Sequence, residues 1–353
     1  MVSRRAKPTI KWGQFMKGIK VVAATMAGLL ALLSACSSDG SSTDNNADPK
    51  SGEVSVALVM SGSITDGGWN QSAYTGLEAL KSSGYTTKFS ENVQQADISS
   101  ALEGYAKDGF DLIIGHGYEF GSAVSELAPK YPDSLFFATT FKPDAGVALP
   151  NNLAFVDVQY YKAAYSTGVL AAMMSTSGKV GVVGGGDNPT QAAMIVAFKA
   201  GAASVNNTEA LGVLTGSYDD PQKGKEAGLA MIGQGADVIA HFANSTGLGA
   251  IEAAISKDAN VIGFYNDQSQ TAPALMGASV KIELAKMVEY LGHSISEKTF
   301  PGGTEWAPEY SFMWSFVAGD TDHNSTLISD DVWAKFKEIS DQVNSGAITV
   351  PTS

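Results

Sequence analysis

The stretch Gly109-Phe-Asp-Leu-Ile-Ile-Gly-His116 recurs 126 positions later as Gly235-Ala-Asp-Val-Ile-Ala-His-Phe242, and this repeat decides the fold. Each copy starts at a glycine and runs into a short apolar segment, which is the pattern of a buried strand. Three strand-like segments at one common spacing indicate a duplicated α/β half. The other two pairs are Glu53-Val-Ser-Val-Ala with Lys179-Val-Gly-Val-Val, and Leu135-Phe136 with Val261-Ile262.

Short apolar runs alternate with helical periodicity in both halves, as in the helical pattern over Ser72–Ser82. Runs that are apolar on both faces and separated by helices predict parallel sheets. We therefore expect an α/β protein with two Rossmann-like lobes, a hinge and a cleft between the lobes. The predicted strands are Val54–Met60, Thr86–Ser90, Leu112–His116, Leu135–Thr140 and Leu153–Val158, then Lys179–Val183, Ala210–Thr215, Val238–His241 and Val261–Tyr265.

The N-terminus is typical of a secreted protein. Residues 1–35 contain six basic residues and no acidic one, and they end in an uncharged run over 21–35. This run is shorter than the ~20 residues that cross a bilayer, so it predicts a signal peptide. The run ends in Leu33-Ser34-Ala35-Cys36, which resembles the lipobox of bacterial lipoproteins. The resemblance implies lipidation of Cys36, whereas a lone cysteine is otherwise a buried, inert residue.

Composition and missing motifs exclude several classes. The chain has 36 acidic and 23 basic residues, a net charge of −13, which argues against binding to nucleic acid. One cysteine and four histidines predict neither a disulfide framework nor a metal site. The run Gly184-Gly-Gly186 is not a dinucleotide motif, because Pro189 stands at the place of its third glycine. No nucleophile–base motif is present, so we expect neither a cofactor nor catalysis.

The loops after the predicted strands are the candidate binding region, because ligands in open α/β sheets bind at the carboxyl ends of the strands. Trp69 lies in the loop after the first strand and offers a flat surface for a base; the alternative is a core residue. Asp66 is expected to cap the next helix. The run His116-Gly-Tyr-Glu119 stands at the end of the third strand. Its ring nitrogen, hydroxyl or carboxylate could orient a ligand; the alternative is a polar loop that closes the strand.

Four motifs resemble the basic membrane protein family, also called the purine-nucleoside receptor lipoproteins. Ser61-Gly-Ser-Ile-Thr-Asp-Gly-Gly-Trp-Asn-Gln-Ser72 resembles the family's D-x-S-F-N-Q-S signature. The other three occur in the family's order: His241–Ala254, Ile262–Gln268 with Ala272-Pro273, and Ser279-Val-Lys281. The resemblance implies a type I periplasmic-binding-protein fold and a substrate-binding role beside an ABC permease, on the extracytoplasmic face of a bacterial cell membrane.

The family's site residues carry over unevenly. Trp69 stands at the place of the family's stacking aromatic, and Lys281 at that of the lysine that meets the ribose. The family's base-reading aspartate falls at Met60 or Ser61, and Tyr265 replaces the first acid of D-S-D-Q. The predicted ligand-binding residues are Ser61, Trp69, Asn70, His116, Tyr118, Asp187, Met194, Asn244, Thr246, Tyr265, Asp267 and Lys281.

The predicted domain organisation follows the repeat. We expect a signal peptide at 1–35, a lipidated tether at 36–52, an N-terminal lobe at 53–157 plus about 270–300, and a C-terminal lobe at 158–269 plus about 301–353. The expected function is that of a monomeric, lipid-anchored receptor of an ABC importer for a purine or nucleoside-like molecule. The alternatives are a binding protein for a sugar or another small polar solute, a receptor that signals without transport, and an α/β enzyme.

Overall fold

The computed structural model describes residues 53–141, 147–308 and 313–353, which all belong to one compact unit of the chain. The predicted signal peptide, Cys36 and the tether lie outside the described residues. Over the described ranges, the structure has no helix that is long and apolar enough to span a membrane.

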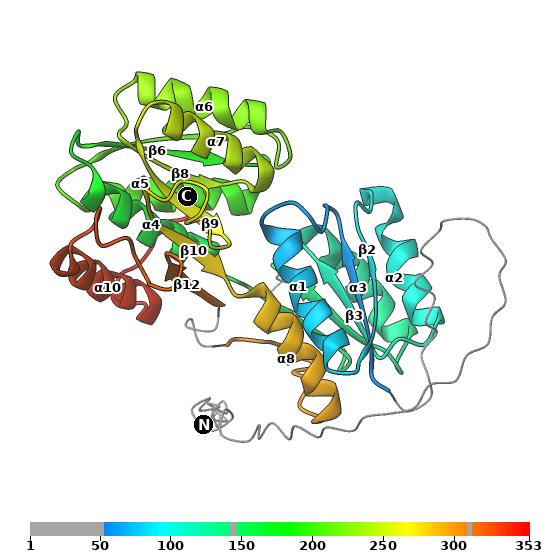
Figure 1. The fold of residues 1–353 in the computed structure, drawn as a ribbon. Helices are drawn as coiled ribbons and strands as arrows, with labels where there is room; N and C mark the ends of the chain where they lie inside the picture. Colours follow the sequence, from blue (N-terminus) through cyan, green and yellow to red (C-terminus); the bar gives the residue numbers. More distant parts are fainter. Residues whose placement is uncertain (1–52, 142–146, 309–312) are drawn as a thin grey trace, which may run out of the picture. The chain divides into compact units, whose positions relative to one another are not determined.

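The first sheet has six strands, and each neighbouring pair is parallel (Figure 1). Helices α1 (Trp69–Ser82) and α8 (Leu284–Ser296) pack against each other, and so do α2 (Ile98–Lys107) and α3 (Gly121–Leu127). Together these elements form the first lobe. Its strands, in spatial order, are β11 (Thr304–Glu305), β5 (Leu153–Val156), β4 (Leu135–Thr139), β3 (Leu112–His116), β1 (Ser55–Met60) and β2 (Thr86–Ser90), and its 3-10 turns are η2 (Gln95–Asp97), η3 (Tyr118–Phe120) and η4 (Ala128–Lys130).

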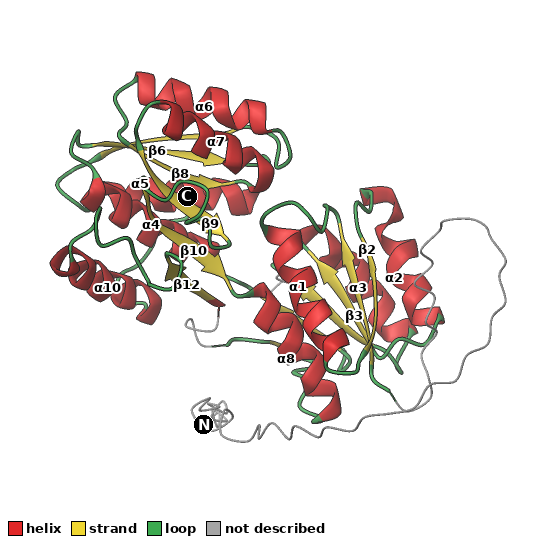
Figure 2. Cartoon of the chain, viewed as in Figure 1, coloured by secondary structure: helices red, strands yellow, loops and turns green. Residues whose placement is uncertain are grey.

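The second sheet repeats this order, with one antiparallel strand at its edge. Helices cover both faces of each sheet, as Figure 2 shows. The second sheet and its helices form the second lobe. Its strands are β12 (Trp314–Val317), β10 (Met276–Ile282), β9 (Asn260–Tyr265), β8 (Val238–Phe242), β6 (Lys179–Gly184) and β7 (Glu209–Leu214), and its helices are α4 (Tyr160–Met174), α5 (Pro189–Ala203), α6 (Pro221–Gly233), α7 (Asn244–Ser256) and α10 (Asp330–Ser345).

Successive residues of β1 belong to different apolar layers. Val56 and Leu58 pack in the cluster that contains the apolar residues of α1 and α8, whereas Ala57 and Val59 pack in the cluster of α2 and α3. All four side chains are fully buried. Because a strand sends alternate side chains to opposite faces, a run without polar residues is what a sheet covered on both sides requires.

The structure confirms the two α/β lobes, and β3 and β8 begin and end 126 positions apart. All nine predicted strands form; β2 and β3 have the predicted bounds, and the ends of the other seven differ by one or two residues. Two longer strands were not predicted, β10 and β12. β12 runs antiparallel to β10, so the second sheet is not wholly parallel as expected.

The predicted lobe boundaries near residues 270 and 301 are wrong. The segment 276–282 extends the second sheet beside β9, because β10 pairs with β9 in parallel. The segment 284–305 belongs to the first lobe, because α8 packs on α1 and β11 pairs with β5. The chain thus passes between the lobes three times, after Val156, Ile282 and Glu305.

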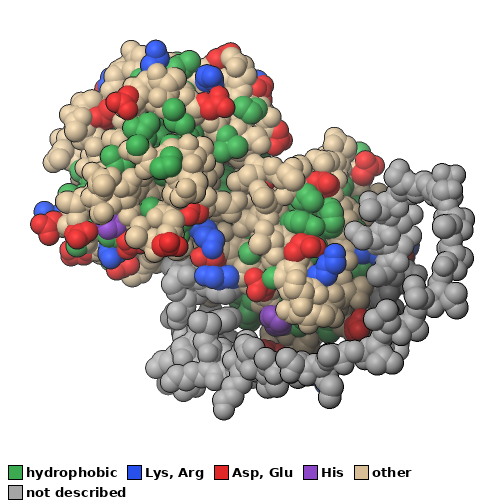
Figure 3. Space-filling model, in the orientation of Figure 1, with side chains coloured by type: hydrophobic (Ala, Val, Ile, Leu, Met, Phe, Trp, Pro, Cys, Tyr) green, Lys and Arg blue, Asp and Glu red, His purple; other side chains and the backbone are tan. Residues whose placement is uncertain are grey.

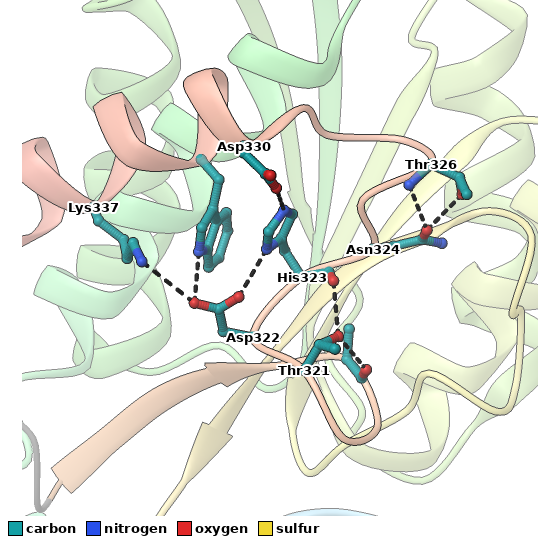
Figure 4. Close-up of polar contacts among 9 residues, drawn as sticks. Thr321, Asp322, His323, Asn324, Thr326, Asp330 and Lys337 are labelled. Atoms are coloured by element: carbon teal, nitrogen blue, oxygen red, sulfur yellow. Dashed lines mark hydrogen bonds and ion pairs between the residues drawn. The ribbon is translucent and has the colours of Figure 1, made fainter.

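A polar cluster fixes the start of α10 in the second lobe (Figure 4). The Asp322 carboxylate accepts hydrogen bonds from Trp333 Nε1 at 2.7 Å and His323 Nδ1 at 2.8 Å. The His323 ring stacks on Trp333 with 4.6 Å between centroids, and Lys337 Nζ lies 3.5 Å from Asp322. The cluster therefore ties the segment after β12 to the first two turns of α10.

Candidate functional site

A cavity of about 330 Å³ lies at the carboxyl ends of strands from both sheets. Its walls are formed by segments that follow β1, β3, β4, β5, β6, β7 and β8, and by the last residue of β9. Ligands of α/β proteins bind at this edge, and the volume suits one small molecule. The lining residues are Ser61, Trp69, Asn70, Gly117, Tyr118, Glu119, Thr140, Tyr160, Asn188, Thr190, Gln191, Met194, Tyr218, Asp219, Asn244 and Tyr265.

Trp69 is the first residue of α1 and one of the aromatic residues that line the cavity. Its ring stacks on His116, with 4.1 Å between centroids and 18° between planes. The rings of Tyr160 and Tyr265 lie edge-on to the indole, with centroid distances of 5.7 Å and 6.3 Å. The indole is half-buried and held on several sides, so its orientation is set before a ligand arrives.

His116 lies behind Trp69 and does not line the cavity. Its Nε2 donates to the Trp69 carbonyl at 3.2 Å, and its Nδ1 accepts from Thr139 Oγ1 at 3.3 Å. Burial lowers the pKa of His116 to about 3, although the hydrogen bond to Trp69 opposes that shift. The predicted ligand-orienting histidine is therefore a neutral support for Trp69.

His241 is a second buried histidine, at the end of β8 in the other lobe. Its Nε2 donates to Gln268 Oε1 at 2.8 Å. Burial lowers the pKa of His241 to about 4, with this bond opposing the shift. In the repeat it corresponds to Gly115, the residue before His116, and no ring stacks on it among the described contacts.

Asp66 caps α1, as the sequence predicted. Its carboxylate accepts backbone N–H bonds from Gly68 at 2.8 Å, Asn70 at 3.0 Å and Gln71 at 3.1 Å. Asn70 Nδ2 donates to it as well, at 2.9 Å. One buried carboxylate therefore satisfies three free N–H groups at the start of the helix.

Residues of the second lobe hold this same turn. Asn244 Nδ2 donates to Asp66 at 2.9 Å, and Ser245 Oγ donates to the Asp66 carbonyl at 3.3 Å. Asn266 Nδ2 donates to the carbonyls of Gly67 and Gly68 at 3.1 and 3.2 Å. The N-terminus of α1 is thus bound to the loops after β8 and β9.

Two cavity residues have strained backbones. Thr140, just after β4, has φ of 57°, and Tyr265, at the end of the equivalent strand β9, has φ of 76°. Such left-handed conformations cost about 1–3 kcal/mol in residues other than glycine and persist where the surroundings hold them. Tyr265 is held by its hydroxyl, which donates to the Phe242 carbonyl at 3.3 Å.

Three buried tyrosine hydroxyls of the cavity are protonated at neutral pH. Burial raises the pKa of Tyr160, Tyr218 and Tyr265. Burial also raises the pKa of the Asp219 carboxyl, and the negative charge of Asp66 adds to this shift.

The cavity brings together seven predicted binding residues from the two lobes. Their role in binding stays a prediction, but their position follows the expected geometry at the strand ends. They are Ser61, Trp69, Asn70, Tyr118, Met194, Asn244 and Tyr265.

The other predicted residues do not line the cavity, His116 included. Thr246 Oγ1 accepts from the backbone N–H of Asp220 at 2.9 Å, and so positions the loop beside Tyr218. Asp267 accepts from the backbone N–H of Gly319 at 3.0 Å, and Lys281 in β10 lies 3.4 Å from Glu283. Asp187 is exposed, and its neighbour Asn188 lines the cavity instead.

Several lining residues were missed at the sequence level. Tyr218 and Asp219 belong to the loop after β7, a strand end that the choice of loops passed over. Tyr160 begins α4 after β5, where the same rule of strand ends applies. The remaining missed residues are Thr140, Asn188, Thr190 and Gln191, whereas Gly117 and Glu119 belong to the loop after β3 that the sequence already indicated.

The described residues contain no group of three or more His, Cys, Asp or Glu that could hold a metal ion. On the face shown in Figure 3, acidic side chains are spread over the described surface, and no broad basic patch is seen there.

Comparisons with known proteins agree with this arrangement. Residues 53–309 match the model of a family described as PnrA-like ABC transporter substrate-binding proteins. The chain is 25% identical over 363 residues to an ABC transporter nucleoside-binding protein of Lactococcus lactis, over 95% of this chain and 99% of that one. It is 30% identical over 227 residues to a purine-binding protein of Brucella abortus, over 63% of each chain.

A solved structure shows the same fold. The solute-binding protein of an ABC transporter system from Conexibacter woesei superposes with a TM-score of 0.69, at 24% identity, over 85% of this chain and 99% of that one. This likeness confirms the type I periplasmic-binding-protein fold, and at this level of identity it concerns the fold alone.

Proposed function

Because the chain belongs to the family of PnrA-like ABC transporter substrate-binding proteins, we propose that it binds a purine or nucleoside-like molecule in this cavity and delivers it to an ABC permease. Members of this family are solute-binding proteins and not enzymes, so the cavity serves for capture. The family expected from the motifs is confirmed.

The position of Trp69 carries the proposal. One face of its ring is covered by His116, and the indole also lines the cavity. A base stacked on an aromatic side chain gains about 1–3 kcal/mol, and the ring needs no charge for this. Because the Trp69 side chain is already held in place, little binding free energy is lost in ordering it.

The two-sided lining supports capture by closure. The first lobe contributes Trp69 and Glu119, and the second contributes Gln191 and Tyr218. A ligand that contacts both lobes binds the closed form more tightly than the open form, and this difference in affinity drives closure. The bonds between Asp66 and Asn244 stabilise the same approach of the lobes.

We place the protein on the extracytoplasmic face of the cell membrane, held by acyl chains on Cys36. The support is the lipobox-like Leu33–Cys36 sequence and the polar run that follows it. A Cys36→Ser variant should leave the membrane fraction and lose labelling by a radioactive fatty acid. Retention in the membrane without a lipid would contradict the anchor.

Isothermal titration of the purified protein with purine bases, nucleosides and simple sugars tests the ligand class. A ligand that binds the folded protein also raises the thermal unfolding midpoint. At a ligand concentration of one hundred times the Kd, the free energy of unfolding rises by about 2.7 kcal/mol. We expect heat and a thermal shift with at least one purine compound.

A sugar is the second candidate. The cavity combines aromatic walls with two carboxylates, Glu119 and Asp219, that can accept hydrogen bonds from sugar hydroxyl groups. Binding of a sugar without binding of any purine would favour this alternative over the first.

A further inference from the structure

The charge of the cavity is one-sided. The described lining residues include the carboxylates of Glu119 and Asp219, one from each lobe, and no Lys or Arg. Asp66 adds a third carboxylate behind the wall, and its charge reaches Asp219. His116, the ring behind Trp69, is neutral because burial lowers its pKa. A ligand in this cavity therefore meets negative potential from both lobes.

The amide groups of the cavity direct their N–H bonds to the protein. Asn70 Nδ2 and Asn244 Nδ2 both donate to the Asp66 carboxylate. Gln191 Nε2 donates to the Phe242 carbonyl at 3.0 Å, and Asn188 Nδ2 donates to the Tyr218 hydroxyl at 2.8 Å. Each of these four amide groups thus gives one of its N–H bonds to the protein and not to a ligand.

Two buried polar atoms of the lining have no partner. Asn70 is 4% exposed and its Oδ1 accepts no hydrogen bond, and Tyr160 is 6% exposed with an unpaired hydroxyl. A buried polar atom without a partner costs about 1–3 kcal/mol, so both favour a ligand that pairs with them. Asn70 Oδ1 is an acceptor only, so it requires a donor on the ligand.

The walls also suit a cation. Trp69 and four tyrosines (Tyr118, Tyr160, Tyr218 and Tyr265) line the cavity. The face of an aromatic ring carries a negative quadrupole and attracts a cation by about 0.5–2 kcal/mol. Carboxylates, an unpaired amide oxygen and aromatic faces all favour the same kind of ligand.

We propose that the physiological ligand is a cation: a flat heteroaromatic molecule with positive charge or a protonated amine, stacked on Trp69 and held by Glu119 and Asp219. This specifies the ligand of the proposed function and rests on it. Phosphorylated and carboxylated molecules are excluded from the cavity by the same carboxylates. Ser61 Oγ, which donates to Glu119 at 2.5 Å, orients that carboxylate.

Two pairs of methylated compounds, each a cation and a neutral counterpart of nearly equal size, test the charge. 1-Methyladenosine is a cation at neutral pH, and its isomer N6-methyladenosine is neutral. 1-Methylnicotinamide and N-methylnicotinamide form the same kind of pair without a purine. We expect titration calorimetry on the full chain to give the cation about tenfold or more tighter binding in at least one pair. Added salt should reduce this ratio, because it screens charges.

Substitutions locate the origin of the preference. Glu119→Gln and Asp219→Asn keep the size of each side chain and should each lower the cation-to-neutral ratio several-fold. Glu126→Gln is the matched control, because Glu126 lies exposed on α3 outside the cavity lining, and it should leave the ratio unchanged. The ratio in the unmodified protein already decides the question if a variant fails to fold.

The outcomes separate this inference from the proposed function. If the neutral compound binds as tightly as the cation in both pairs, or if neither carboxylate variant changes the ratio, the charge proposal is overturned and purine capture stands. If only the nicotinamide cation binds, the charge proposal stands and the purine assignment falls. If no compound of either pair binds, the charge proposal falls, and the titration with unmodified purines decides on purine capture.

Discussion

Asn244 Nδ2 donates to the Asp66 carboxylate at 2.9 Å, although the two residues are 178 positions apart in the chain. Each stands at the N-terminus of a helix, Asp66 before α1 and Asn244 as the first residue of α7. Both side chains are buried. The same carboxylate that caps α1 therefore also links the two lobes beside the cavity.

Asp66→Asn should lower the free energy of unfolding by about 2 kcal/mol or more, because the amide has one acceptor oxygen where the carboxylate has two. Asn244→Ala removes a single donor to Asp66 and should cost about 1 kcal/mol. Urea unfolding of both variants measures the difference. Equal losses would show that Asp66 acts through Asn244 alone and not as a cap.

Trp69→Ala should weaken ligand binding by more than about tenfold, because the stacking surface is lost. Trp69→Phe keeps a smaller ring and should lose less. Titration calorimetry with the ligand found in the screen measures both affinities, and circular dichroism checks that each variant folds. Unchanged affinity in Trp69→Ala would remove the platform from the site.

The buried histidines should make the fold sensitive to acid. Burial holds the pKa of His116 at about 3 and that of His241 at about 4, below the ordinary value of 6.5. The unfolded chain therefore binds protons first, and the stability from each neutral ring is complete above about pH 6.5 and is lost as the pH falls toward the folded pKa.

His116→Phe keeps an aromatic ring against Trp69 but cannot be protonated. Its free energy of unfolding should fall less steeply than that of the unmodified protein between pH 6.5 and pH 4, by up to about 1.4 kcal/mol per pH unit. Urea unfolding at several pH values gives both slopes. Identical slopes would mean that His116 is protonated in the folded protein.

Asp322→Asn should destabilise the protein without changing ligand binding. Burial alone would raise the pKa of Asp322, but hydrogen bonds from His323 and Trp333 and the charge of Lys337 outweigh it, so the pKa is lowered. The carboxylate thus stabilises the fold above its unfolded pKa, and this is lost as the pH falls through the folded value. The unfolding temperature should drop while the calorimetric affinity is preserved; a loss of affinity would connect this cluster to the cavity.

Gly76→Ala tests the packing of α1 on α8. A Cβ at Gly76 would lie 2.4 Å from the Ala285 carbonyl oxygen, so the helices must separate. Gly104→Ala on α2 is the matched control, because a Cβ there meets nothing within 4 Å. The thermal midpoint should fall markedly in the first variant and stay or rise in the second. A similar midpoint in both would mean that α8 contributes little.

The repeat was sufficient to predict the fold of each lobe, because buried strands leave runs of apolar residues at fixed spacing. β10 was missed because Ser279 and Lys281 were interpreted as a binding motif and not as alternating strand residues. The lobe of that segment could not be inferred, since it depends on which strand β10 pairs with. That pairing is decided by tertiary packing, and the local sequence pattern does not predict it.

The site was predicted to the extent that it follows from topology. Ser61, Tyr118 and Tyr265 line the cavity because they stand at or after strand ends. The partners of a side chain are a different matter: the stack of His116 on Trp69 and the pairing of Lys281 with Glu283 depend on rotamers and distances. Residue type and spacing do not determine either of these.

The three passages of the chain between the lobes bear on how the protein is made. The first lobe needs α8 and β11, which end at Glu305, whereas most of the second lobe lies before that residue. During synthesis on the ribosome, the first lobe therefore cannot complete its fold until α8 and β11 have been made, although its N-terminal part is synthesised before the second lobe. A fragment cut near residue 158 would leave the α8-facing side of α1 uncovered, and the two halves cannot be produced as separate, self-sufficient polypeptides.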